Sequence, residues 1–60
     1  MILAQLKLVM VDRKISTEEL AVKALMSSST INRARAGQHI TPYTGIRIAK
    51  ALKTTVEALQ

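Results

Sequence analysis

Apolar residues recur at helical spacing in the first part of this chain. The larger ones fall within a sector of about 100° on a helical wheel, so the pattern predicts an amphipathic helix from about residue 2 to residue 12. The inward residues of this helix are Ile2, Leu3, Leu6, Val9 and Met10. Ile15 is expected to pack where the chain then turns, and Ala4, Leu8 and Val11 are left on the opposite side of the helix.

A capping-box pattern precedes the next helical stretch. The Ser16 hydroxyl can accept a hydrogen bond from the backbone of Glu19, while the Glu19 side chain reaches back to the backbone of Ser16. A second helix is therefore predicted to begin at Thr17. The residues on its inward face are Leu20, Ala21 and Ala24.

Two terminal signals frame a third helix of about nine residues. Ser27 is a favourable N-cap, and Gly37 suits the position just beyond a helix end. Only Ile31 and Ala34 are apolar on the inward side, so this helix is expected to bury one narrow stripe. The residues left on its polar face are Ser28, Ser29, Asn32 and Arg33.

A fourth helix is predicted from Thr41 as N-cap, with Pro42 in the first helical position, to about Lys53. Its inward residues are expected to be Ile46, Ala49 and Leu52, with Ile48 beside them. Its outward residues are expected to be Arg47, Lys50 and Lys53. Gly45 in the first turn costs up to ~1 kcal/mol relative to alanine, which close packing or simple tolerance must explain.

A short fifth helix is predicted near the end of the chain, with Thr54 or Thr55 as its cap and Leu59 in its last turn. The chain contains no repeat, low-complexity tract or linker. We therefore expect a single all-α domain over residues 1–60, a compact bundle of about five short helices.

The length and composition limit what such a domain can hold. A 60-residue chain buries only about 60% of its unfolded surface, which leaves room for one small core and no deep substrate cleft. The chain has no cysteine, so packed aliphatic side chains must stabilise it in place of disulfides or thiolate-bound zinc. The apolar N-terminal stretch lacks a basic leader and is shorter than the ~20 residues of a membrane span. We expect a cytoplasmic protein without membrane contact.

The charge of the chain narrows the classes of partner. Nine Lys and Arg residues against four Asp and Glu give a net charge of +5, which suits a polyanion such as nucleic acid. Neither a nucleophile–base pair, a carboxylate pair, a metal-ligand cluster nor a glycine-rich phosphate loop is present, so we expect no enzyme, metal, cofactor or small-molecule substrate. His39, the only histidine, is read as a loop residue.

The order and spacing of several segments resemble the Cro/phage-repressor (XRE-type) helix-turn-helix family, and the resemblance covers nearly the whole chain. The matching segments are Ser16 to Ala21, Ser27 to Arg33, Gly37, Pro42, and Ile48 to Leu52. The resemblance implies a lambda-repressor-like domain whose third helix reads base edges in the major groove. It would make this chain a transcriptional regulator of phage type, most simply a repressor, that binds double-stranded DNA.

Carried onto this sequence, the resemblance implies two sets of DNA contacts. The base readers are Ser28, Ser29 and Arg33, with Ser27 and Asn32 at the margin of the set. Arg33 is the sharpest candidate because a guanidinium can donate two parallel bonds to guanine O6 and N7. The backbone contacts are Ser16 and Thr17 at the start of the second helix, and Gln38, His39, Thr41 and Tyr43 after the third, where Asn32 can also contribute.

This sequence departs from the family pattern at three points. Thr17 stands where the family usually has glutamine, and Leu25 stands where it usually has glycine in a left-handed turn. Leucine in that conformation costs about 1 kcal/mol or more, so a strained turn is expected at Leu25. Met10 and Arg35 occupy positions where the family often pairs arginine with glutamate. Arg35 is then expected to point to solvent, to Asp12 or to DNA.

Two further questions stay open at the level of sequence. We expect a homodimer, at least on DNA, formed either through the outer side of the first helix or, as the resemblance implies, near Val56 and Leu59. Two alternatives to the regulator are a DNA-docking, antitoxin-like protein whose main activity is partner binding, and a protein-interaction module with an incidental basic face.

Overall fold

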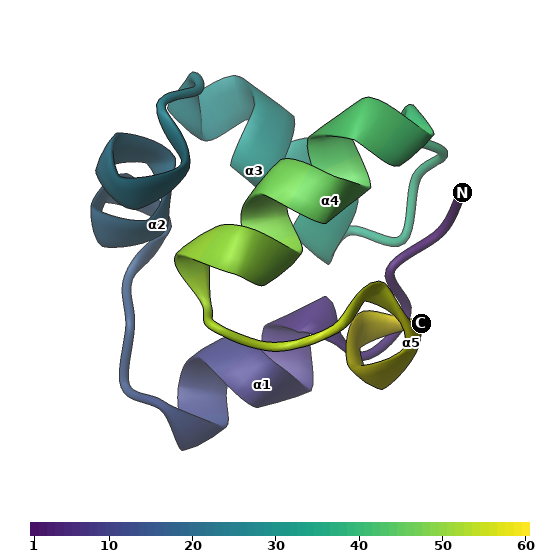
Figure 1. Ribbon diagram of the computed structural model, residues 1–60. Helices are drawn as coiled ribbons and strands as arrows, with labels where there is room; N and C mark the ends of the chain where they lie inside the picture. The colour runs from purple at the N-terminus through teal and green to yellow at the C-terminus, as the bar shows by residue number, and fades with distance from the viewer.

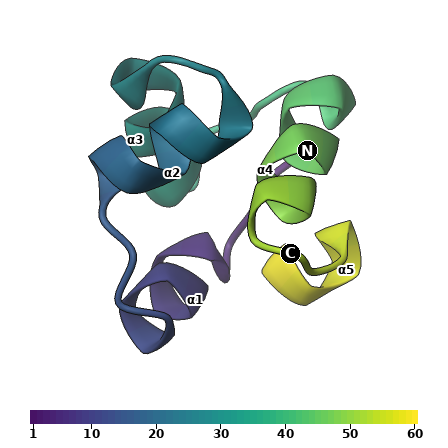
Figure 2. The ribbon, with the colours of Figure 1, turned by 60° about the vertical axis from the view of Figure 1, so that its left-hand side comes forward.

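The computed structural model describes residues 1–60 and is entirely helical, as the sequence predicts (Figure 1). Its five helices are α1 (Leu6–Asp12), α2 (Thr17–Ala24), α3 (Ser28–Arg35), α4 (Pro42–Ala51) and α5 (Val56–Leu59). They form a small bundle in which α1 lies below α2 and α3, while α5 lies beside the start of α1 (Figure 2). None of the helices is long and apolar enough to cross a membrane.

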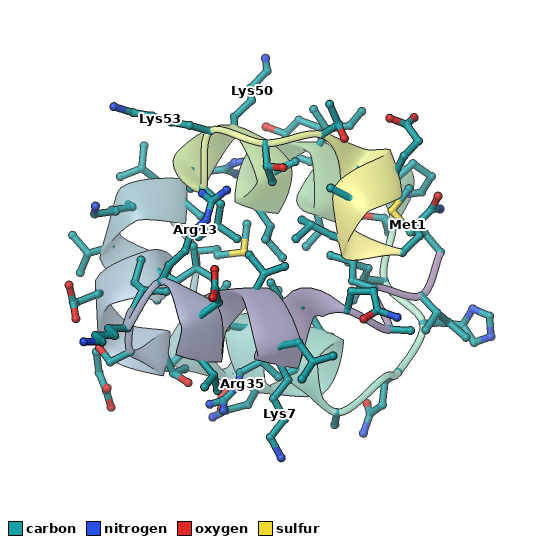
Figure 3. The ribbon with its side chains drawn as sticks, turned by 90° about the horizontal axis from the view of Figure 1, so that it is seen from below. Met1, Lys7, Arg13, Arg35, Lys50 and Lys53 are labelled. Carbon is teal, nitrogen blue, oxygen red and sulfur yellow. The ribbon has the colours of Figure 1, made fainter.

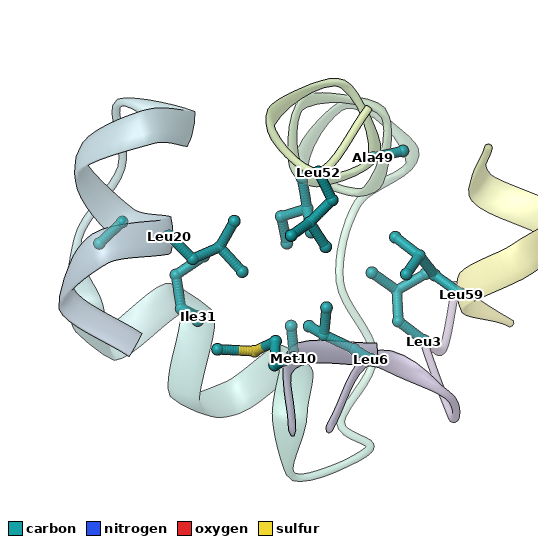
Figure 4. Close-up of a cluster of buried hydrophobic side chains, with 11 residues drawn as sticks. Leu3, Leu6, Met10, Leu20, Ile31, Ala49, Leu52 and Leu59 are labelled. Atoms are coloured by element: carbon teal, nitrogen blue, oxygen red, sulfur yellow. The ribbon is translucent and has the colours of Figure 1, made fainter. Parts of the chain in front are cut away.

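One aliphatic core holds the five helices together (Figure 4). Its largest fully buried side chains are Leu3, Leu6, Met10, Leu20, Ile31, Ile48 and Leu59. No polar or charged residue is buried, so the removal of apolar side chains from water is the main stabilising contribution. Every helix contributes to this core.

The helix starts confirm the predicted N-caps. Ser16 and Glu19 form both hydrogen bonds of the capping box, and Ser27 accepts a bond from the backbone of Thr30. Thr41 caps α4 in the same way, with Pro42 directly after it. Of the two candidates for α5, the cap is Thr55, which accepts from Ala58. These caps satisfy backbone N–H groups that have no partner within the helix.

The ends of α1 to α4 share a different feature, in which one of the first two residues after the helix adopts a left-handed conformation. Gly37 does so after α3 with φ +81°, as predicted. Three other positions use a residue with a side chain: Lys14, Leu25 and Lys53 have φ of 55°, 56° and 54°. At each, the backbone N–H bonds of a Schellman motif close the helix end. The strain predicted at Leu25 is confirmed, and the two lysines are additional to it.

Relief of this strain gives a stability prediction for Leu25→Gly. Leu25 is 79% exposed and left-handed, so it is strained without contributing to the core. Glycine should stabilise the fold by roughly 1 kcal/mol, because the relief of a left-handed leucine exceeds the added chain entropy. Chemical denaturation should show the gain, and Val22→Gly inside α2 is a control that should lose stability. A loss of ~2 kcal/mol at Leu25 would instead show that it behaves as a core residue.

Several details differ from the sequence predictions. The first helix begins at Leu6 rather than near residue 2, and Ile2 is 39% exposed rather than inward. The fourth helix ends at Ala51, short of Lys53. Ile46 is 45% exposed, whereas its neighbour Ile48 is fully buried. Arg47 of α4 and Leu59 near the C-terminus also differ from their predicted exposure.

Arg47, predicted outward, is half-buried because its Nη2 donates to the backbone carbonyls of Ala24 and Leu25 at 2.7 and 2.8 Å. Leu59 is fully buried, so it cannot belong to a self-association surface in this fold. Gly45 has a packing role, since a Cβ there would lie 2.3 Å from the Sδ atom of Met1.

Candidate nucleic-acid interface

Helices α2 and α3 are joined by a tight turn that leaves one side of α3 free. The turn passes through left-handed Leu25 and reaches Ser27, whose side chain starts α3. Ile31 and Ala34 of α3 are completely buried, which fixes the inward face of the helix. The predicted base readers that stay exposed are Ser27, Ser29, Asn32 and Arg33, while Ser28 is half-buried. Four of these five positions are therefore accessible to a large ligand.

A polar hollow of about 430 Å³ joins the free side of α3 to the start of α4. It is lined by Thr30, Arg33, His39, Ile40, Thr41 and Thr44. The structure thus brings Arg33 of the predicted base readers together with His39 and Thr41 of the predicted backbone contacts. The hollow combines a guanidinium, an imidazole and three hydroxyls without any carboxylate, a set of groups suited to a phosphate.

Thr30 and Thr44 were not among the predicted contacts, although both belong to this hollow. The signal for each was present in the sequence as the third residue of a capped first turn. The Thr41 hydroxyl donates to that of Thr44 at 3.0 Å, and Thr30 lies 3.0 Å from the Ser27 hydroxyl. Such i, i+3 pairs place a second hydroxyl beside each cap.

The start of α2 holds a second group of predicted contacts. Nη1 of Arg35 donates to the Thr17 hydroxyl at 2.7 Å, and that hydroxyl lies 3.5 Å from Oδ1 of Asn32. Arg35 is half-buried and bonded to Thr17, so none of the three destinations expected for it describes its main contact. Its Nε is buried without a partner. A shallow hollow of about 210 Å³ beside it is lined by Lys7, Asn32, Arg35 and Ala36.

Lys7 and Arg35 lie next to one another on the α3 side of the molecule (Figure 3). Two cations side by side with no carboxylate in the hollow favour the approach of an anion. Lys7 was not a predicted contact, because it belongs to α1 and its nearness to α3 depends on the tertiary packing of the two helices.

Three predicted backbone contacts, Tyr43, Gln38 and Ser16, line neither of these hollows. The Tyr43 ring lies on the outer side of α4, where the guanidinium carbon of Arg47 stands 5.4 Å from the ring centroid. Gln38 is exposed and lines no hollow. Ser16 is exposed, and its hydroxyl accepts a hydrogen bond from the backbone of Glu19 in the capping box.

The acidic residues of the chain all lie outside α3 and the loop that follows it. No Asp or Glu occurs between Leu20 and Val56, whereas α3 alone carries Arg33 and Arg35. The four carboxylates belong to α1, α2 and α5. A polyanion that contacts α3 and the loop after it therefore meets no carboxylate of those elements.

Comparison with protein-family models, with curated proteins and with solved structures gave no match.

Proposed function

We propose that this protein is a sequence-specific DNA-binding regulator that places α3 in the major groove of double-stranded DNA. The observation that carries the proposal is the polar, carboxylate-free outer side of α3, with exposed Arg33 beside the hollow that contains His39 and Thr41. A helix of this kind, held from behind by Ile31 and Ala34, has the dimensions and the donors that groove recognition requires.

Residues of α3 contact the base edges, and the two hollows beside it contact the phosphate backbone. Arg33 donates to a guanine edge, and Ser28 and Ser29 in the first turn of α3 supply weaker hydroxyl contacts. The hydroxyls and His39 at the start of α4 hold the phosphates on one side of the groove. Arg35, oriented by Thr17 and joined by Lys7, holds the phosphates on the other side.

Selection of bound sequences from a random pool of DNA duplexes tests the proposal. A single enriched motif is expected, with affinity for that motif that falls steeply as salt rises and that exceeds the affinity for bulk DNA by about 10³-fold or more. Equal binding to all sequences would rule out a sequence-specific regulator and would indicate a general polyanion-binding protein. Absence of DNA binding at low salt would remove the proposal altogether.

A regulator with one short recognition helix gains specificity by dimerising. We propose a homodimer that represses by occupying a pseudo-palindromic operator, with half-sites about one helical turn apart. With Leu59 in the core, the remaining candidate surface is the outer side of α1, where Leu8 and Val11 are each 65% exposed. The patch is small, so the dimer is expected to form on DNA rather than free in solution.

The variant Leu8→Glu tests this surface. It is expected to leave the fold intact and to abolish the second, cooperative binding step on an operator with two half-sites, because it introduces a charge into the apolar contact. Sedimentation equilibrium with and without operator DNA measures the stoichiometry. Val22→Glu on α2, another exposed apolar position at 74%, is the matched control and should not change it. Wild-type copies that occupy each half-site independently would refute the dimer but not the DNA contact.

A second candidate function, partner binding by a DNA-docking or interaction module, is favoured by one observation. Val22 and Leu25 are 74% and 79% exposed, and with Met26 they line an apolar hollow of about 680 Å³ beside the α2–α3 turn. Exposed apolar surface of this kind is typical of protein contacts. If this is the main activity, the random-pool selection will yield no motif.

A further inference from the structure

A third basic hollow lies away from the outer side of α3. It has a volume of about 280 Å³ and is formed by the α1–α2 connection, α2 and the end of α4, with no residue from α3. Its charged residues are Arg13, Lys14, Glu19, Lys23 and Lys53. Figure 3 shows Arg13 and Lys53 toward the α4 side of the molecule, whereas Lys7 and Arg35 lie at the opposite edge.

The cations of this hollow are largely free to bind an anion. Four of the nine Lys and Arg residues of the chain line it, against the single carboxylate of Glu19. Oε1 of Glu19 already accepts from the backbone of Ser16 at 3.3 Å. No lysine side chain donates a hydrogen bond within the protein.

Arg13 is held at the hollow by a hydrogen bond from its side chain to the backbone. Nη1 of Arg13 donates to the carbonyl of Leu52, which ties the α1–α2 connection to the end of α4. The apolar residues Ile15, Ala51 and Leu52 complete the lining. The guanidinium is therefore held in place before any ligand arrives, which reduces the entropy lost on binding.

Two of the lysines occupy positions that folding alone does not favour. Lys14 and Lys53 are the left-handed residues that follow α1 and α4, where glycine is unstrained. The negative end of each helix attracts a cation, but a lysine in the last helical turn gains the same attraction without the strain. Their shared position at one hollow therefore indicates a role other than closing the helices.

We propose that this hollow is a binding site for an oligophosphate anion, distinct from the DNA contact of α3. A chain of phosphates matches several lysine ammonium groups around one guanidinium that is already hydrogen-bonded to the protein. The shared chemistry is found both in inorganic polyphosphate and in nucleoside triphosphates. The proposal does not depend on whether α3 reads DNA.

Titration of the protein with inorganic tripolyphosphate and, separately, with ATP tests the site, with backbone amide NMR shifts as the readout. The largest shifts are expected at residues 13–15 and 51–53. The test variant is Lys14→Gly with Lys53→Gly, which removes two charges and also two strained residues. It should lower the affinity for tripolyphosphate about tenfold or more while the midpoint of thermal unfolding stays the same or rises.

The matched control is Lys7→Ala with Arg33→Ala, which removes the same charge from the α3 side. It should change tripolyphosphate affinity less than about twofold, but should weaken DNA binding if the proposed function holds. Equal affinity for tripolyphosphate and ATP would identify the phosphate chain as the ligand. Tighter binding of ATP would show that the site also contacts the nucleoside. The proposed site would be overturned by an equal loss of tripolyphosphate affinity in both variants, or by NMR shifts confined to α3. It would also be overturned if the residues of the hollow shifted with duplex DNA but with neither phosphate.

Discussion

Replacement of Arg33 by alanine is expected to relax the preference for one base pair in each half-site. The loss on specific DNA should be ~1–3 kcal/mol, with little loss on random DNA, because a bidentate contact to guanine discriminates between bases by that amount. The Arg33 side chain is exposed and makes no hydrogen bond within the protein, so the helix content should not change. Competition binding with single-base operator variants measures the effect.

Lys50→Ala is a matched control for this experiment, since it removes one exposed cation from α4. It should lower affinity for all sequences alike, if at all, through the general electrostatic contribution. If Arg33→Ala behaves in the same way as Lys50→Ala, Arg33 contacts a phosphate rather than a base. The hollow it shares with His39 and Thr41 would then serve the backbone alone.

The helix starts could be predicted from the sequence because a cap is a local interaction. Ser16, Ser27 and Thr41 each satisfy a backbone N–H three residues ahead, and no distant residue is needed. The strain at Leu25 was predictable for a different reason, because the family resemblance placed a left-handed residue there. Lys14 and Lys53 carried no such signal, because lysine gives no indication of a left-handed conformation.

Residues whose burial depends on a neighbouring element were harder to predict. Ile46 and Ile48 are both compatible with the apolar stripe of α4, and only the position of the core decides that Ile48 is buried. Met1 packs against Gly45, 44 residues later in the chain, and nothing near Gly45 in the sequence indicated that contact. The direction of Arg35 was similarly set by Thr17, 18 residues away in sequence.

The candidate interface also contains some residues that local sequence identifies and others that only the packing of distant elements brings together. The exposed residues of α3 could be listed from its polar side, because Ile31 and Ala34 leave only one face for burial. The partners of these residues could not, because His39 and Thr41 reach Arg33 through the loop that leads to α4. Lys7 joins Arg35 only through the packing of α1 against α3.

Leu59→Ala is expected to cause the largest loss of stability of any variant considered for this protein. Leu59 is fully buried beside Leu3 and Leu6, and its backbone carbonyl accepts from Gln5 at 2.8 Å (Figure 4). Truncation of a buried leucine costs about 2–5 kcal/mol, whereas the core of so small a domain rarely supplies more than ~3–5 kcal/mol. A substantial unfolded population is therefore expected at room temperature.

Urea denaturation followed by far-ultraviolet circular dichroism measures this loss, with Glu57→Ala on the exposed side of the same helix as the control. The control should change stability by no more than about 0.5 kcal/mol. The family resemblance implied a dimer contact near Leu59, and a core residue and an interface residue differ in the result they predict. A folded Leu59→Ala variant with normal stability and an altered stoichiometry on operator DNA would show that Leu59 belongs to an interface. A loss of stability in the free protein would show that Leu59 is a core residue, which its burial against the N-terminal segment predicts.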